Sequence, residues 1–374
     1  MNQTRLFPTT VVGSLPRPQW VLDLFQRRWD GGISEEEFQQ RLDNAVLFAI
    51  QLQDMAGIDI ITDGEYRRES YVKIFAQRVS GFERDALDGS AILDDGNYFN
   101  PRSRQVLPPS EAKSPLRYPA VVQPIQYDQP LVLDDSRFLL ANTSRPVKVT
   151  LPSPYILSRR LWHPDFSHDA YPTREDFLEA ILPILKEECR RLQSEGVHFI
   201  QLDDPWLSLF VDEGYRDHFE EVEREIHLSM DSINRVVEGL NVKTGVHFCR
   251  AHYNRQTGFR GDYSYLMPFL KELKVSQLVM EFALPNAGSL EVLENFPEEM
   301  ELGLGCVDVR AVEIPDPDQI VGMVKEACRY VDKERITLNP DCGFAPSHTN
   351  PIPPDEAYLK LRAMAEAAQR LRNE

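Results

Sequence analysis

The sequence predicts an α/β fold of the (β/α)₈ TIM-barrel class, with residues 1–374 forming a single barrel. Three features support this prediction: eight short apolar or β-branched runs, helical patterns between most of them, and polar residues gathered where the runs end. The runs lie at residues 9–14, 58–65, 146–154, 197–205, 243–250, 277–283, 301–310 and 335–344. Repeated strand–helix alternation is typical of parallel βαβ units closed into a barrel. An open doubly wound sheet is the alternative, and it is weakened because no GxGxxG turn follows the first run.

Helical patterns fill most of the connections between these runs. The first extends from Ser34, an N-cap candidate, to Gly57, a residue type that often ends helices. Another follows Thr173, which with Asp176 resembles a capping box, and it contains Pro183, where we expect a kink. Helical spacing also occurs at residues 216–240, 262–274, 317–332 and 355–372.

Residues 75–143 break this alternation. They are rich in Pro, Ser and Asp and contain short runs with an extended pattern, such as YPAVVQPIQY and PLVLDD. We predict an inserted β-hairpin or long loop after the second strand. Such an insertion is typical either of a cover over a functional site or of a passive or oligomer-contacting segment, and the sequence leaves both open.

Composition narrows the class of protein. The net charge is −18, from 59 acidic and 41 basic residues, which argues against nucleic acid and anionic membrane as general partners. No apolar stretch approaches membrane-spanning length, and the first residues lack a signal-peptide pattern. Five irregularly spaced cysteines do not form a disulfide framework. We therefore expect a cytoplasmic protein with free or metal-bound thiols.

Four potential metal ligands stand at predicted strand ends in the last third of the chain. They are His247 and Cys249 in GVHFCR, Glu281 in LVMEFA and Cys342 in LNPDCGF. Residues i and i+2 of a strand share a face, so His247 and Cys249 can reach one metal together. A lone His or Cys is more often a packing residue, but this combination favours a catalytic Zn²⁺ site. Cys189, Cys306 and Cys328 lack such neighbours and are expected to pack in the core.

The chemistry that needs this site is alkylation of a thiol. The thiolate is the nucleophile, and a free aliphatic thiol is mostly protonated at neutral pH. Coordination to zinc deprotonates it. A carboxylate ligand such as Glu281 is a candidate to leave when the substrate sulfur arrives.

Two carboxylates end other predicted strands, Glu65 on the second and Asp203 on the fourth. Across the mouth of one barrel they could hold a substrate ammonium group. The alternative is a strand-end cap or a salt bridge to Arg67 or Arg68, since structural ion pairs are common at such positions.

Several motifs together resemble the catalytic barrel of the cobalamin-independent methionine synthase family. They are TTVVGSLPRP, ITDGEYRR, IQLDDPWL, GVHFCR, VMEFA, GCVDVR and LNPDCGFAPS, and they are most similar to the short, single-barrel members. The resemblance implies zinc-dependent methyl transfer to homocysteine, giving methionine. It places the zinc ligands at His247, Cys249, Glu281 and Cys342, and the homocysteine site at Gly13, Ser14, Glu65 and Asp203.

Two departures from that family leave parts of the mechanism open. The long enzymes have a histidine, thought to deliver a proton, two residues after the Asp of the seventh strand; here Asp308 is followed by Arg310. Arginine cannot act as a general acid at neutral pH but can bind an anionic group of the donor or substrate. The long enzymes also carry a further N-terminal barrel. The methyl donor is therefore open between methylfolate, methylcobalamin and a corrinoid protein.

Three other functions remain as alternatives. The first is zinc-dependent alkylation of another thiol, such as coenzyme M by an epoxide, in which Arg17, Arg68 or Arg310 would hold the sulfonate. The second is a zinc-free decarboxylase resembling uroporphyrinogen decarboxylase. The third is a non-catalytic thiol- or metal-binding protein.

Overall fold

The fold is described from a computed structural model of the chain. It describes residues 5–374 apart from 89–90, 94–95, 101–103, 109, 112–116, 251–254, 256–258, 285–286 and 346–351. The last two residues of the LNPDCGFAPS motif and parts of the predicted insertion lie outside the described residues.

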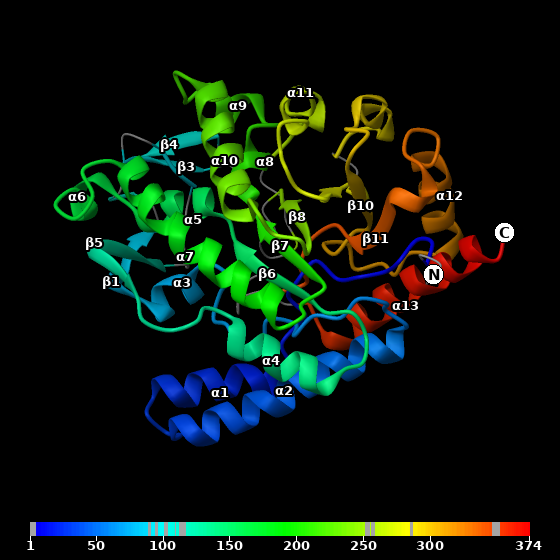
Figure 1. Cartoon of the computed structure of the whole chain (residues 1–374), viewed down its shortest axis with the longest axis horizontal. Helices are drawn as coiled ribbons and strands as arrows, with labels where there is room; N and C mark the ends of the chain where they lie inside the picture. Colours follow the sequence, from blue (N-terminus) through cyan, green and yellow to red (C-terminus); the bar gives the residue numbers. More distant parts are fainter. Residues whose placement is uncertain are drawn as a thin grey trace.

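A parallel sheet of six strands forms the centre of the molecule (Figure 1). Its spatial order is β11 (Ile336–Pro340), β10 (Glu301–Val307), β9 (Gln277–Glu281), β8 (Lys243–Phe248), β7 (Phe199–Asp203) and β6 (Lys148–Pro152). All neighbouring strands pair in parallel. Nearly every residue of these strands is buried, as expected when helices cover the outside of a parallel sheet.

The first two predicted strands join the sheet through short contacts. Parallel bridges connect Thr9 to Leu338, Thr10 to Ile60, and Ile61 to Val147, so the two segments link β11 back to the start of β6. With the six strands they complete the ring of eight positions expected of a (β/α)₈ barrel.

These two segments are shorter than predicted because side chains, instead of neighbouring strands, take the hydrogen bonds of their backbone groups. The backbone N–H of Thr62 donates to the Gln53 side chain at 3.0 Å, and the Thr62 hydroxyl donates to the Gly13 carbonyl at 3.0 Å. Beyond Ile61 the second segment therefore leaves the sheet, and the predicted range of residues 58–65 is too long for a strand.

Helices surround the sheet (Figure 1). Ser34 caps α2 (Glu35–Ala56), and Gly57 ends this helix with φ 85°, as predicted. Thr173 and Asp176 form the predicted capping box of α7 (Arg174–Ser194), which contains Pro183. The longer helices are α1 (Gln19–Trp29), α2 (Glu35–Ala56), α5 (Pro154–Leu161), α7 (Arg174–Ser194), α10 (Val222–Val237), α12 (Pro317–Ala327) and α13 (Pro354–Arg372). Shorter turns are α6 (Pro164–Ser167), α8 (Pro205–Leu209), α9 (Glu213–Arg216), η1 (Tyr263–Tyr265), α11 (Met267–Leu270), η2 (Leu290–Asn295) and η3 (Lys333–Arg335).

The helix predicted at residues 262–274 is the main correction among these elements, because only η1 and the single turn α11 form there. The Asn234 side chain explains the early end. Its amide donates to the Glu272 carbonyl at 2.9 Å, and its oxygen accepts the Lys274 N–H at 2.7 Å. Both backbone groups are thereby taken out of a helical ladder.

Residues 75–143 contain two small antiparallel sheets and two helices. β1 (Val79–Asp88) pairs with β5 (Arg117–Tyr127), and β2 (Ala91–Ile92), β3 (Tyr98–Asn100) and β4 (Gln105–Leu107) form the second sheet. The YPAVVQPIQY run lies in β5 as an extended segment. PLVLDD does not, because the helix α4 (Leu133–Asn142) begins inside it, after α3 (Lys73–Arg78) has begun the segment.

This segment packs over the elements that follow β7 and β8. Phe99 of β3 contacts the rings of Tyr215 and Phe259, with centroids 5.5 and 6.2 Å away. Arg104 pairs with both oxygens of Asp212, at 2.6 and 2.8 Å. The insertion is therefore docked on the carboxyl-end side of these strands, where barrel active sites lie.

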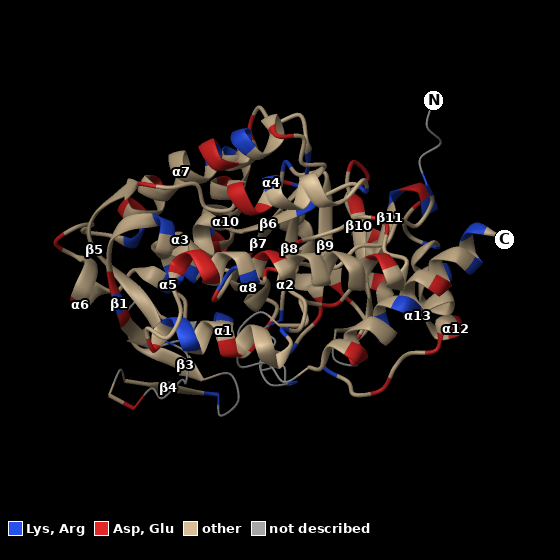
Figure 2. Ribbon diagram, turned by 90° about the horizontal axis from the view of Figure 1, so that it is seen from below, with Lys and Arg blue, Asp and Glu red and all other residues tan. Residues whose placement is uncertain are grey.

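Charged residues of both signs are interspersed along outer helices such as α13 (Figure 2). Among the described residues, no helix combines the length and the apolar character that crossing a bilayer would require.

A buried carboxylate joins three of the outer helices and supports a stability prediction. Glu225 of α10 accepts hydrogen bonds from Arg159 at 2.5 Å, Arg174 at 2.7 Å and Tyr155 at 2.7 Å. We expect Glu225→Gln to lower the free energy of unfolding by about 2–3 kcal/mol, because buried guanidinium groups lose their charged partner. Urea-induced unfolding measures this change.

The control is Glu179→Gln, which removes an exposed partner of Arg235 between α7 and α10. Exposed pairs contribute less than about 1 kcal/mol, so this variant should unfold almost as wild type does. Equal losses in the two variants would contradict the special role of the buried carboxylate.

Candidate metal centre and substrate site

The four predicted ligands come together at the carboxyl ends of three strands. His247 is in β8 and Cys249 directly follows it, Glu281 ends β9, and Cys342 follows β11. One ligand atom from each residue lies within 4.8 Å of the others. His247, Glu281 and Cys342 are buried, whereas Cys249 is partly exposed.

His247 is prepared for coordination through Nε2. Its Nδ1 lies 3.3 Å from the Val279 carbonyl oxygen, which can only accept, so Nδ1 carries the proton. Nε2 is buried and has no hydrogen-bond partner among the described residues. Burial, together with the cationic charge of Lys148, lowers the pKa of His247 to about 3. The imidazole is therefore neutral, the form that binds metals.

The two cysteines lie against each other as free thiols. Their Sγ atoms are 3.2 Å apart, well beyond the length of a disulfide bond at about 2.05 Å. The hydrogen bond to Cys249, followed by burial, raises the pKa of the Cys342 thiol well above its ordinary value. Two thiolates at this separation repel each other, and a bound cation would allow both to form.

The two carboxylate oxygens of Glu281 differ in their hydrogen bonding. Oε1 accepts the Arg250 backbone N–H at 2.9 Å and an Arg310 N–H at 3.2 Å. Oε2 is buried, lies 3.0 Å from Arg310 Nη1, and has no partner in hydrogen-bond geometry among the described residues.

This donor set fits zinc. One imidazole nitrogen, two sulfurs and one carboxylate oxygen are all normal zinc donors, and four are the number that it usually takes. The buried Nε2 of His247 and Oε2 of Glu281 are the two atoms that a metal would satisfy.

The predicted substrate carboxylates lie in the same barrel. Glu65 follows the second barrel segment with φ 58°, an unusual value for a non-glycine residue, and is 4% exposed. Its Oε1 accepts the Thr150 hydroxyl at 2.7 Å and lies 3.9 Å from Arg68 Nη1. The expected salt bridge to Arg68 is thus present but long, while Arg67 pairs with Asp43 and Asp135 instead.

Gly13 and Ser14 lie beside these groups. A Cβ added at Gly13 would lie 2.4 Å from Glu65 Oε1, so only glycine leaves room for this carboxylate. The Ser14 hydroxyl accepts the Ala345 N–H at 3.2 Å, in the loop that follows Cys342. Ser14 therefore connects the first barrel segment to the loop that carries Cys342. Its hydroxyl also lies close to Gly343 in this loop.

Asp203 carries the most perturbed carboxyl group of the substrate site. Burial and then the charge of Glu65 raise its pKa to about 8, although Gln201 donates a hydrogen bond to it at 2.7 Å. Two buried carboxylates that cannot both ionise easily are suited to a cationic partner. A substrate ammonium would allow both to be charged.

This pKa leads to a prediction about pH and stability. In the unfolded chain Asp203 ionises near its ordinary value of 3.8, whereas in the folded protein it keeps its proton up to about pH 8. Its contribution to stability is complete below pH 3.8 and is lost as the pH rises to about 8. Between pH 5 and 7 we expect the unfolding free energy of wild type to fall relative to Asp203→Asn by about 1.4 kcal/mol per pH unit.

The measurement is urea unfolding of both proteins at several pH values across this range. Asparagine has nearly the same shape and does not ionise, so the variant serves as its own control for packing. Parallel pH dependences of wild type and variant would show that Asp203 has an ordinary pKa.

Asp308 and Arg310 lie at the end of β10, but the two side chains have different partners. Asp308 Oδ1 accepts the backbone N–H of Arg310 at 2.8 Å and so stabilises the turn. The Arg310 guanidinium points instead to Glu281, with both terminal nitrogens within 3.2 Å of its oxygens. Of the pair, only Arg310 contacts a candidate metal ligand through its side chain.

Several residues of this site were not predicted from the sequence. Thr150 positions Glu65, Gln201 positions Asp203, and Lys148 donates to Gln201 at 3.0 Å. Burial and the charge of Tyr118 raise the pKa of Tyr71, and the charges of Cys249 and Asp203, which lie near it, raise this pKa further. Alternation was an available signal, because Lys148 with Thr150 and Gln201 with Asp203 occupy every second position of their strands.

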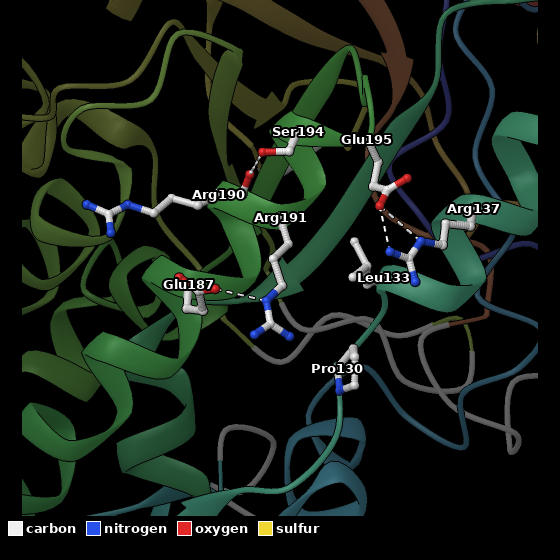
Figure 3. A pocket seen from close by; sticks show the side chains of 8 residues that line it. All are labelled: Pro130, Leu133, Arg137, Glu187, Arg190, Arg191, Ser194 and Glu195. Carbon is white, nitrogen blue, oxygen red and sulfur yellow. Dashed lines mark hydrogen bonds and ion pairs between the residues drawn. The ribbon is translucent and has the colours of Figure 1, made fainter.

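A surface pocket on α4 and α7 is separate from this site (Figure 3). It is lined by Pro130, Leu133, Arg137, Glu187, Arg190, Arg191, Ser194 and Glu195. It lies where α7 ends before the start of β7, at the opposite end of the strands from the ligand group. Arg137 pairs with Glu195 at 2.7 Å and Arg191 with Glu187 at 2.9 Å, so these charges offset each other.

Known proteins are similar to this chain along nearly its whole length. The family model described as "Cobalamin-independent synthase, Catalytic domain" matches residues 7–97 and 103–370. A methionine synthase from Pyrococcus furiosus is 30% identical over 370 residues, covering 99% of this chain and 94% of the relative. One from Thermococcus kodakarensis is 29% identical with the same coverage.

A solved structure supports the same fold. The B12-independent methionine synthase from Shewanella sp. W3-18-1, in complex with selenomethionine, superposes with a TM-score of 0.78 over 98% of both chains, at 24% identity. This confirms the predicted fold class. Since the family model spans most of the chain and the Pyrococcus relative reaches 30% identity over 99% of it, the chain belongs to the cobalamin-independent methionine synthase family, a family of methyltransferases.

Proposed function

We propose that this protein transfers a methyl group to the thiol of homocysteine, giving methionine, with zinc held by His247, Cys249, Glu281 and Cys342. The observation that carries the proposal is the gathering of these four donor atoms within 4.8 Å in a barrel that also buries Glu65 and Asp203. The relatives are named methionine synthases, which supports homocysteine as the thiol.

The chain's own residues divide the work between two groups. When bound, zinc lowers the pKa of a coordinated thiol so that the thiolate persists at neutral pH. Glu65 and Asp203 hold the substrate ammonium, and Thr150 and Gln201 fix the orientation of the two carboxylates. Gly13 leaves room for Glu65, and Ser14 ties the first segment to the loop of Cys342. The substrate sulfur is thereby aimed at the methyl donor.

The rival that alkylates coenzyme M receives less support. Its sulfonate needs a free cationic group, but Arg17 donates to the carbonyls of Glu65 and Arg68 at 2.8 and 2.7 Å. Arg68 donates to Thr150, and Arg310 pairs with Glu281. The buried carboxylates favour a cationic substrate group instead. Family membership and the four-ligand group also favour methyl transfer over a zinc-free decarboxylase and over a non-catalytic binding protein.

The test combines metal analysis with a thiol assay. We expect about one zinc per chain and methionine formation from homocysteine when a suitable donor is supplied. Methylfolate, methylcobalamin and a methylated corrinoid protein are supplied in separate reactions, since the family description names catalysis without a cobalamin cofactor but leaves the source of the methyl group open. A reaction of coenzyme M with an epoxide, in the absence of any homocysteine turnover, would overturn the proposal, as would a metal-free active protein.

A further inference from the structure

We propose that Arg310 is a positioning residue that receives the Glu281 carboxylate when a substrate thiolate takes its place among the metal donors. This inference rests on the proposed function. The role assigned to Arg310 is to hold a metal-ligand side chain of the protein. It is neither proton delivery nor binding of the substrate.

The geometry connects Arg310 specifically to the carboxylate ligand. Arg310 Nη1 lies 3.0 Å from Glu281 Oε2, and Nη2 lies 3.2 Å from Oε1. The two side chains are 3% and 0% exposed, so water does not replace this contact. Arg17 and Arg335, by contrast, donate to backbone carbonyls and so hold loops in place. Arg159 and Arg174 do pair with a buried carboxylate, but that carboxylate, Glu225, is outside the ligand group.

Arg310 also has hydrogen-bonding capacity to spare. Its Nε and Nη1 atoms are buried without a partner in hydrogen-bond geometry among the described residues, and the same holds for Glu281 Oε2. A small rotation of the carboxylate towards the guanidinium would satisfy donors and acceptor together. The resulting two-pronged pair is the strongest arrangement that arginine and a carboxylate make. The present contact between Arg310 and Glu281 therefore makes fewer hydrogen bonds than the two side chains could form.

The surrounding charges explain why a permanent cation is needed here. Besides Glu281, the neighbours that favour a charged Arg310 are Cys342, Cys249 and Asp341, all acidic groups. Asp341 is itself buried, with its Oδ1 accepting the N–H groups of Phe282 and Ala283 at 3.0 Å each. A carboxylate released into this environment would meet thiolates and another acid. Arg310 offsets its charge.

The exchange balances without a further reactant. With zinc bound, the Glu281 oxygen would give up its place among the metal donors, the substrate sulfur would take that place, and the thiol proton would pass to bulk water. The released carboxylate keeps its negative charge and pairs with Arg310. The residue therefore favours the thiol-bound state without contacting the thiol.

X-ray absorption at the zinc edge tests this inference, because it counts sulfur ligands independently of turnover. In zinc-loaded wild type, which has two cysteine ligands, homocysteine should raise the count from two sulfurs to three. In Arg310→Gln we expect zinc to be retained and the third sulfur to be absent at the same homocysteine concentration. The homocysteine dissociation constant, followed in the cobalt-substituted protein by its visible spectrum, should rise by about 10–100-fold.

Arg310→Lys keeps the charge but loses the two-pronged geometry, so it should gain the third sulfur with about tenfold weaker homocysteine binding. It also provides the test if Arg310→Gln does not fold. Arg335→Gln, which removes contacts to the backbone carbonyls of Pro297 and Met300 just before β10, is the matched control and should exchange ligands as wild type does.

The outcomes separate this inference from the function on which it rests. A normal third sulfur and an unchanged homocysteine constant in the Arg310 variants, with exchange intact in wild type, would overturn the role of Arg310 alone. Wild type that binds no zinc, or that gains no sulfur from homocysteine, would overturn the proposed function itself.

Discussion

Replacing Cys342 with alanine should remove both the bound metal and the activity. Cys342 supplies one of only two sulfur donors in the ligand group, and its Sγ lies 3.2 Å from that of Cys249. Changes to residues that merely support metal ligands reduce affinity or activity by about 10–100-fold, so loss of a ligand should exceed that range. We expect the zinc content to fall from about one per chain to near zero after dialysis against a weak chelator.

The variant also separates chemistry from folding. Cys342 is 3% exposed but lies just after β11, and the small change from cysteine to alanine leaves the β10–β11 pairing intact. Circular dichroism should therefore stay near that of wild type while methionine formation drops below detection. Without the metal, the substrate thiol returns to its ordinary pKa and is mostly protonated at neutral pH.

Cys306→Ala is the matched control for this experiment. Cys306 is another buried cysteine in the same part of the sheet, within β10, but its sulfur contacts the Asn339 carbonyl and not the ligand group. It should keep full zinc and full activity. Full zinc and full activity in Cys342→Ala would instead exclude this residue as a ligand and with it the proposed centre.

The sequence predicted the ligand group because its signals are local. His247 and Cys249 share a strand face by their spacing alone, and each of the other two ligands directly ends or follows a strongly apolar run. Once the runs are assigned to parallel strands, their carboxyl ends must meet at one side of the sheet. The positions of all six paired strands follow from the same reasoning, within a few residues.

What could not be predicted depends on contacts between distant side chains. The first two barrel segments are short because Gln53 and Thr62 take their backbone partners, and no local pattern marks either residue for that role. The pairing of Arg310 with Glu281 joins residues 29 positions apart and appears only when β9 and β10 lie side by side. Composition likewise showed an insertion but not the helix α4 within it.

The second large effect is expected from a change at the site that binds the ammonium group of homocysteine. Glu65→Gln should weaken homocysteine binding by about 2–5 kcal/mol, a factor of roughly 30 to several thousand in the dissociation constant, because a buried ammonium loses a charged partner. Glutamine has nearly the same shape and can still accept from Thr150, which now donates to Glu65 at 2.7 Å. Zinc content should not change, because Glu65 is outside the ligand group.

Calorimetric titration of the zinc-loaded protein with homocysteine measures this loss. A thiol of similar length without an amino group should bind wild type poorly and should be little affected by the substitution. Glu69→Gln is the control, since Glu69 lies four residues further along the chain and pairs with Lys73 outside the barrel mouth. Unchanged homocysteine binding in Glu65→Gln would favour a substrate without an ammonium group, such as coenzyme M.

Asp203 limits how much homocysteine binding is lost in Glu65→Gln. The charge of Glu65 is one of the two main causes that raise the pKa of Asp203 to about 8, so removing that charge lets Asp203 ionise at lower pH. Asp203 can then pair with the ammonium more readily than in wild type, and the single variant keeps part of its binding. The double variant Glu65→Gln with Asp203→Asn has no such compensation. Its loss should therefore exceed the sum of the two single losses, the sign of coupling expected when two carboxylates share one cation.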